Sequence, residues 1–216
     1  MSDLVYSAPM DQNFEPWAKY PALTKQRLSA IAVAMRDVRD QTVPLHDVAA
    51  GDNAWSLGCR IYARTLFALR RASETREWLT ILPESEALRF TFAIGGVPLK
   101  FYRGDVEDAP GHCRIISEAE SLARQLLLDL EGIAIEDRLL RLVVDTNAEG
   151  STLSVTLIEM DKSGRLTGRY SIPFDADGER AISILPPGVD PGPPSIRPLA
   201  SIDQDEEKKR GERNAG

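Results

Sequence analysis

The sequence predicts an α+β protein: an antiparallel sheet, built from a hairpin at 88–103 and a meander at 138–174, that is covered by about three helices. Two observations predict this class. Segments with helical periodicity do not alternate one-for-one with segments of strand periodicity, so a doubly wound parallel sheet is disfavoured. The strand segments alternate apolar and polar residues, which is typical of antiparallel sheets with one face in water. We therefore expect the helices on a single face of the sheet.

Composition narrows the class of protein further. The chain has 216 residues, 43% of them hydrophobic, which is enough for a well-formed core. Its net charge of −7 provides no overall basic field that would attract nucleic acid. Cys59 and Cys113 are too few for a disulfide framework, and neither a signal peptide nor a long apolar span is visible. We therefore expect a cytoplasmic protein with reduced thiols, without a cofactor and without membrane contact.

Proline and charge mark the ends of the folded part. Residues 1–22 contain three prolines and predict an irregular N-terminal arm. A single α+β domain is predicted over 23–185, and 104–116 is the place where it could divide. Six prolines from position 186 to 198, followed by a run of charged residues, cannot bury enough apolar surface to offset the entropy of ordering. The segment 186–216 is therefore predicted to be a disordered tail.

Two of the three helices are predicted by simple patterns. The first spans 23–40, where apolar residues recur at helical spacing on one face: Leu28, Ile31, Met35 and Val38. Trp17 and Tyr20 of the arm are expected to pack onto the body. Another helix, over 117–131, begins with a capping box formed by Ser117 and Glu120. Its apolar face is made of Ala119, Leu122, Ala123, Leu126, Leu127 and Leu130.

The helix predicted at 53–72 carries two contrasting faces. Asp52 or Asn53 is the expected N-cap. One stripe is apolar and is expected to face the core: Trp55, Cys59, Tyr62, Leu66 and Leu69. The opposite face carries Arg60, Arg64, Phe67 and Arg71. Guanidinium groups suit carboxylates and phosphates, and an aromatic ring among them can anchor a protein partner. This face is therefore the leading candidate for a binding surface.

Residues 88–103 predict a β-hairpin closed by Gly95 and Gly96, because glycine reaches the positive φ angles of tight hairpin turns. This turn fixes a register in which the cross-strand pairs share one apolar face: Ile94 with Val97, Phe92 with Leu99, and Phe90 with Phe101. Pro98 lacks an N–H on the side away from its partner, which predicts that 97–103 is an edge strand. The other face is expected to offer a second contact surface: Arg89, Thr91, Lys100 and Tyr102.

The meander at 138–174 consists of three alternating strands joined by Asn/Asp-to-Gly turns. Short strands are also expected at 77–82 and 181–185. The polar face of the meander, which includes Arg141 and Thr156, is expected to lie in water.

Catalytic motifs are missing from the sequence: there is no phosphate-binding glycine loop, no dinucleotide fingerprint and no His-Glu-x-x-His zinc motif. We therefore expect a non-enzymatic accessory or regulatory protein. It would bind a protein partner through the helix at 53–72, the strand at 97–103 or the tail. An edge strand can accept a partner strand, and a charged tail can act as a linear binding element.

Two alternatives stay open. A metal-assisted hydrolytic enzyme would use an acidic loop whose carboxylates and imidazole suit divalent ions: Asp105, Glu107, Asp108 and His112. The spacing of these residues matches no calcium-binding loop, so no metal is the primary expectation. A nucleic-acid-binding accessory protein would place Arg60, Arg64 and Arg71 against phosphates.

Overall fold

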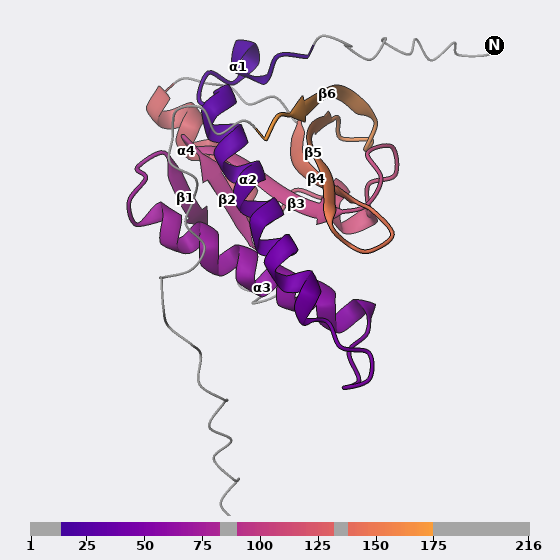
Figure 1. Cartoon of the computed structure of the whole chain (residues 1–216). Helices are drawn as coiled ribbons and strands as arrows, with labels where there is room; N and C mark the ends of the chain where they lie inside the picture. The colour runs from indigo at the N-terminus through magenta and orange to yellow at the C-terminus, as the bar shows by residue number, and fades with distance from the viewer. Residues whose placement is uncertain (1–13, 83–89, 132–137, 175–216) are drawn as a thin grey trace, which may run out of the picture. The chain divides into compact units, whose positions relative to one another are not determined.

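A six-stranded mixed sheet forms the centre of the fold (Figure 1), and the order of its strands in space is the order in the chain. The strands are β1 (Leu79–Leu82), β2 (Thr91–Ile94), β3 (Val97–Arg103), β4 (Leu139–Thr146), β5 (Thr152–Met160) and β6 (Leu166–Ile172). Every neighbouring pair is antiparallel except β3 and β4, which run parallel. The α+β class is confirmed, whereas the prediction of a purely antiparallel sheet is wrong.

The computed structural model describes the chain over residues 14–82, 90–131 and 138–174. The chain divides into two units, Met1–Ile184 and Leu185–Gly216, and only the first contains described residues. The predicted tail at 186–216 and the predicted strand at 181–185 therefore lie outside the described residues.

Helix α4 (Glu118–Glu131) explains the parallel pair. Parallel neighbours need a crossover that returns the chain to the starting end of the sheet, and a helix is the usual connection. Here α4 lies between β3 and β4 in the chain and packs against β2 and β3. Its start is the predicted capping box: the Ser117 N–H donates to Glu120 Oε2 over 3.0 Å, and the Glu120 N–H donates to Ser117 Oγ over 3.3 Å.

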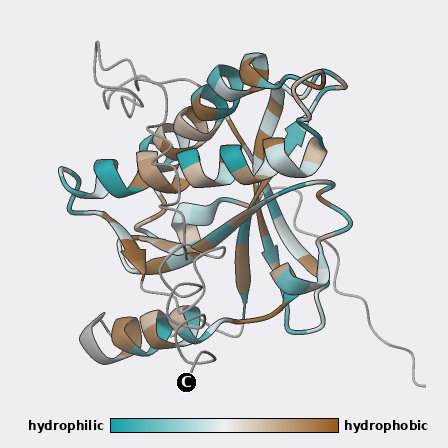
Figure 2. Cartoon of the chain, turned by 90° about the horizontal axis from the view of Figure 1, so that it is seen from below, coloured by the Kyte–Doolittle hydropathy of each residue, from teal (hydrophilic) through white to brown (hydrophobic). Residues whose placement is uncertain are grey.

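Helices cover both faces of the sheet, which corrects the prediction of a single covered face (Figure 2). On one face α2 (Lys25–Thr42) packs against β5 and β6, and α3 (Ala54–Ser73) packs against α2 and β1. On the other face lie α4 and the short helix η2 (Gly111–Arg114). Arg141 and Thr156 are consequently buried rather than in water. No helix among the described residues has the length and apolar character that crossing a bilayer requires.

The hairpin register is confirmed from Phe92 to Leu99, whereas the predicted pair of Phe90 and Phe101 lies outside the ladder. Ile94 pairs with Val97, and Phe92 pairs with Leu99. Gly95 and Gly96 have φ angles of 53° and 81°, as the tight turn requires. A Cβ atom on Gly96 would lie 2.5 Å from Cδ2 of Leu127, so the turn also leaves no room for a larger residue.

The prediction that 97–103 is an edge strand is wrong. Lys100–Arg103 pair with Arg141–Val144 of β4, so β3 lies in the interior of the sheet. Pro98 precedes the first residue of this ladder, and its missing N–H therefore breaks no bond to β4. In the described sheet, the edge strands are β1 and β6.

Residues 14–22 of the N-terminal arm include one helical turn, α1 (Pro16–Lys19), and pack onto the body through Trp17 and Tyr20, as predicted. Tyr20 is buried, and the ring of Trp17 meets the ring of Tyr170 edge-on at 5.1 Å between centroids. The predicted face of α2 is buried as expected: Leu28, Ile31, Met35 and Val38. Ser29, Ala30, Ala32, Val33 and Ala34 are buried too, so the middle of α2 is enclosed on nearly all sides.

Candidate functional site

Helix α3 is buried only over its second half. The buried residues are Ile61, Thr65, Ala68, Leu69 and Ala72. Before Ile61 the helix has no buried residue, because the end of the α2–α3 pair extends past the strands (Figure 1). The predicted core stripe is therefore correct for Leu69 and wrong for Trp55 and Cys59, both of which are exposed.

Four exposed apolar residues on α3 follow one another at intervals of four: Trp55, Cys59, Ala63 and Phe67. Residues at this spacing form a continuous ridge on a helix surface, and we call this set the α3 ridge. Its two ends are large and its middle is small, with Trp55 76% and Phe67 55% exposed. At a rise of about 1.5 Å per residue, the ridge extends over roughly 18 Å.

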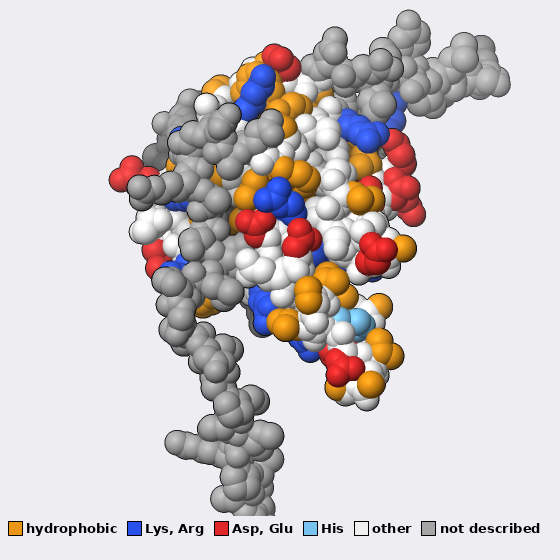
Figure 3. All heavy atoms as spheres, in the orientation of Figure 1, with side chains coloured by type: hydrophobic (Ala, Val, Ile, Leu, Met, Phe, Trp, Pro, Cys, Tyr) orange, Lys and Arg blue, Asp and Glu red, His pale blue; other side chains and the backbone are white. Residues whose placement is uncertain are grey.

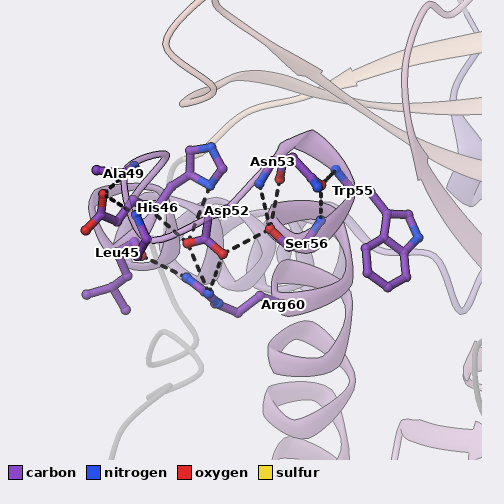
Figure 4. Close-up of polar contacts among 10 residues, drawn as sticks. Leu45, His46, Ala49, Asp52, Asn53, Trp55, Ser56 and Arg60 are labelled. Carbon is purple, nitrogen blue, oxygen red and sulfur yellow. Dashed lines mark hydrogen bonds and ion pairs between the residues drawn. The ribbon is translucent and has the colours of Figure 1, made fainter.

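The loop before α3 adds further exposed apolar side chains. Leu45 ends the short helix η1 (Val43–Leu45) and is 52% exposed, and Val48 in the following turn is 72% exposed. Hydrophobic side chains accordingly gather at this end of the helix pair (Figure 3). In Figure 4, Leu45 and Trp55 lie on opposite sides of the start of α3, so the loop residues form a separate exposed apolar group.

A hydrogen-bond network holds the start of α3 in place (Figure 4). Asn53, one of the two predicted N-caps, accepts from the N–H groups of Trp55 and Ser56, each over 3.0 Å. Asp52 accepts from Ser56 Oγ over 3.0 Å and from Arg60 Nη2 over 3.1 Å. Figure 4 shows the Trp55 indole pointing away from this network. The backbone is therefore fixed by neighbours that leave the indole uncovered.

Asp52 is the centre of this network. The Asp47 N–H, the Ser56 hydroxyl and the Arg60 guanidinium together hold the pKa of its carboxyl below the ordinary value, although partial burial opposes them. Arg60 also donates from Nη1 to the Leu45 carbonyl over 2.8 Å. Arg60, a predicted binding residue, is thus engaged in fixing the loop to α3.

The other arginines of α3 differ from Arg60. The helix carries four arginines and no Asp or Glu between Ala54 and Ser73. Arg64 contacts Thr42 Oγ1 at 3.3 Å, and Arg64 and Arg70 are exposed. Within the described part of the chain, neither these two nor the half-buried Arg71 takes part in an ion pair. The structure thus places Arg64, Phe67 and Arg71 together on a surface that keeps its positive charge.

The predicted second contact surface is covered. Tyr102 is buried, and its hydroxyl donates to the Asp105 carbonyl over 3.1 Å. Lys100 lies 14% exposed beside Glu120 of α4, with 3.2 Å between Nζ and Oε2. Arg89 lies outside the described residues. Because α4 and η2 cover this face, Lys100 and Tyr102 are unavailable to a partner.

A buried ion-pair cluster, formed by Arg141, Glu120 and Lys100, ties α4 to the sheet. Arg141 Nη1 donates to Glu120 Oε1 over 2.6 Å, and neither side chain is exposed. Arg141 also donates from Nε to the Cys113 carbonyl over 2.8 Å. Burial raises the pKa of Glu120, but the Arg141 charge, the Ser117 N–H and Lys100 outweigh it, so the pKa lies below its ordinary value. Alternating polarity could not reveal this cluster, since the pattern assigned Arg141 to water.

The acidic loop does not gather its carboxylates. Asp108 pairs with Arg114 at 3.0 Å, and Glu107 lies 3.8 Å from Arg169. Asp105 accepts from the Glu107 N–H over 2.9 Å. Over the described ranges, no group of three or more His, Cys, Asp or Glu side chains is placed to hold a metal ion, His112 included.

A second buried carboxylate fixes the N-terminal arm. Glu159 of β5 accepts from the Tyr20 hydroxyl over 2.6 Å, from Lys19 Nζ over 2.8 Å and from Thr167 Oγ1 over 2.8 Å. Burial raises the pKa of Tyr20, and the hydrogen bond to Glu159 raises it further. The oxygens of this carboxylate are occupied by the arm and β6, so its role is structural.

Comparison with known proteins finds no matching family, no matching curated protein and no matching solved structure.

Proposed function

We propose that this protein is a non-enzymatic accessory or regulatory protein that binds a protein partner through the α3 ridge. The observation that carries the proposal is the exposure of Trp55 and Phe67, 76% and 55%, on one ridge of a single helix. Exposed aromatic side chains dominate the binding energy of many protein interfaces, because burying them removes a large apolar area from water.

The support beneath the ridge favours binding as well. The N-cap at Asn53 and the bonds from Arg60 to Asp52 and Leu45 hold the first turns of α3 before any partner arrives. A surface that is already ordered loses less conformational entropy on association. The ridge is therefore a preorganised surface.

Affinity capture from extracts of the cells of origin tests the proposal. The wild-type protein is compared with the double variant Trp55→Ala/Phe67→Ala. The matched control is Leu153→Ala on β5, whose side chain is 57% exposed. We expect a specific protein to be recovered with the wild type and the control and to be lost with the double variant. Circular dichroism verifies that all three chains fold.

If the double variant recovers the same proteins in the same amounts as the wild type, the α3 ridge is not the binding surface and the proposal fails.

A further inference from the structure

The charge of α3 is opposite to that of the chain as a whole. Its 20 residues include four arginines and no carboxylate, whereas the chain has a net charge of −7. Arg60 is neutralised by Asp52, at 3.1 Å. The remaining three arginines lie on the same helix as the α3 ridge. A partner that buries the ridge must therefore meet uncompensated positive charge.

The arginines have a definite position relative to the ridge. Arg64 follows Ala63 and is on the next row of the helix surface, the row that also contains Arg60. Arg71 lies one turn beyond Phe67, on the same side as Arg64 at about 100° per residue. Arg70, which is exposed, lies on the other side of Phe67 at the same rotation per residue, so positive charge surrounds the Phe67 end of the apolar ridge.

We propose that the partner segment is an acidic amphipathic helix. Its apolar stripe packs along the α3 ridge, and its carboxylates pair with Arg64 and Arg71. The small side chains of Cys59 and Ala63 allow the two helices to approach closely, while Trp55 and Phe67 enclose the partner's apolar stripe at both ends. This inference rests on the proposed function and adds the chemistry of the partner.

A second copy of this chain is a poorer occupant. The α3 helix of a second copy would bring four more arginines and no carboxylate to the contact, so it offers Arg64 and Arg71 no partner of opposite charge. Like charges brought together at an interface cost several kcal/mol. Nucleic acid also fits less well, because the chain's net charge of −7 repels phosphates over the wider surface.

Fluorine NMR on fluorotryptophan-labelled protein tests this assignment. The chain has three tryptophans. Trp17, which meets Tyr170 edge-on, and Trp78, beside Arg27 and Arg76, serve as internal references. Trp55→Phe assigns the ridge signal. The probes are a synthetic helical peptide with leucines on one face and glutamates on one flank, the same peptide with lysines for glutamates, and single-stranded DNA.

We expect the glutamate peptide to shift the Trp55 signal and to leave the two reference signals in place. Because exposed charges are screened by salt, its affinity should fall as ionic strength rises. Arg64→Glu/Arg71→Glu should weaken binding about tenfold or more, since two attractive pairs become repulsive. Arg165→Glu/Arg169→Glu on the distant β6 side makes the same change in net charge and should leave affinity unchanged.

Four results would overturn the inference: no shift with the glutamate peptide, an equal shift with the lysine peptide, a larger shift with DNA, or affinity that is unaffected by Arg64→Glu/Arg71→Glu. These results are distinguishable from failure of the proposed function. If the Trp55→Ala/Phe67→Ala variant loses the captured protein but the glutamate peptide produces no response, the α3 ridge is the binding surface and its partner is not an acidic helix. If the wild type and the Trp55→Ala/Phe67→Ala variant recover the same protein in equal amounts, the α3 ridge is not the binding surface.

Discussion

Replacing Glu120 by glutamine tests the buried ion-pair cluster. Glutamine keeps the shape of the side chain and an oxygen that can accept from the Ser117 N–H, so the helix cap survives. It removes the negative charge 2.6 Å from Arg141, and the Arg141 side chain has no exposed surface through which water could compensate. Breaking a buried pair by removing one partner costs about 3–5 kcal/mol. We expect the lower end, about 3 kcal/mol, because hydrogen bonds from Arg141 to the Cys113 and Leu140 carbonyls remain.

Urea unfolding, followed by circular dichroism at pH 7, measures this loss of unfolding free energy. In thermal unfolding, the melting temperature should fall by about 6–12 °C, at roughly 2–4 °C per kcal/mol for a domain of this size. The control is Glu118→Gln, an exposed carboxylate in the first turn of the same helix, which should cost about 0.5 kcal/mol. If Glu120→Gln unfolds within about 0.5 kcal/mol of the wild type, the cluster does not hold α4 to the sheet and the reasoning is wrong.

Acid provides a second measurement on the same pair of proteins. The folded-state pKa of Glu120 lies below the ordinary 4.5, so the folded protein holds this proton less tightly than the unfolded chain does. The stabilisation from the Glu120 charge is therefore complete above the ordinary pKa and is lost as pH falls through the lowered one. We expect the difference in unfolding free energy between wild type and Glu120→Gln to be constant near neutrality and to shrink at acidic pH. A difference that grows on acidification would contradict the assigned direction.

Three further predictions concern single positions. Gly96→Ala should destabilise by about 1–3 kcal/mol in urea unfolding, because φ is 81° and the new Cβ would lie 2.5 Å from Leu127; an unchanged midpoint would mean that the turn relaxes freely. Gly58→Ala should stabilise by about 0.5–1 kcal/mol in the same assay, since this α3 position has nothing within 4 Å of an added Cβ. Cys59 should react rapidly with a maleimide in the native protein while Cys113, 1% exposed, reacts only on unfolding; two equally fast thiols would contradict the burial of Cys113.

The sequence was sufficient to predict those elements that depend only on residues close together in the chain. The turn at Gly95 and Gly96, together with the alternation on either side, determined the hairpin register to the residue. The capping residues Asn53 and Ser117 located two helix starts, because a cap needs only groups within three residues of each other.

Contacts between residues far apart in the chain could not be predicted from local sequence patterns. The edge prediction for 97–103 failed because β4, whose partner ladder starts at Arg141, is brought in by a helical crossover that no residue of β3 encodes. Arg141 was assigned to water for a related reason: its partner Glu120 lies 21 residues earlier, and alternation alone treats every arginine as exposed.

The candidate site was predicted in part. Arg64 and Phe67 are exposed on α3 and Arg71 is half-buried beside them, but Trp55 and Cys59 were assigned to the core. Their helical spacing is the same whether the face meets a sheet or water. Trp55 and Cys59 are exposed because the first turns of α3 extend past the strands, so no sheet covers them. The relative lengths of helix and sheet are a property of the whole fold.

The bond between Tyr20 and Glu159 joins residues 139 positions apart, and this has a consequence for how the chain is made. At about 5–20 residues per second, a ribosome takes roughly seven to twenty-eight seconds to go from Tyr20 to Glu159. During that interval α2, whose middle is enclosed in the finished fold, has no β5 or β6 to pack against. The apolar helix α2 is therefore synthesised well before the strands β5 and β6 that cover it. We expect a chain stopped before β5 to aggregate or to require capture by a chaperone.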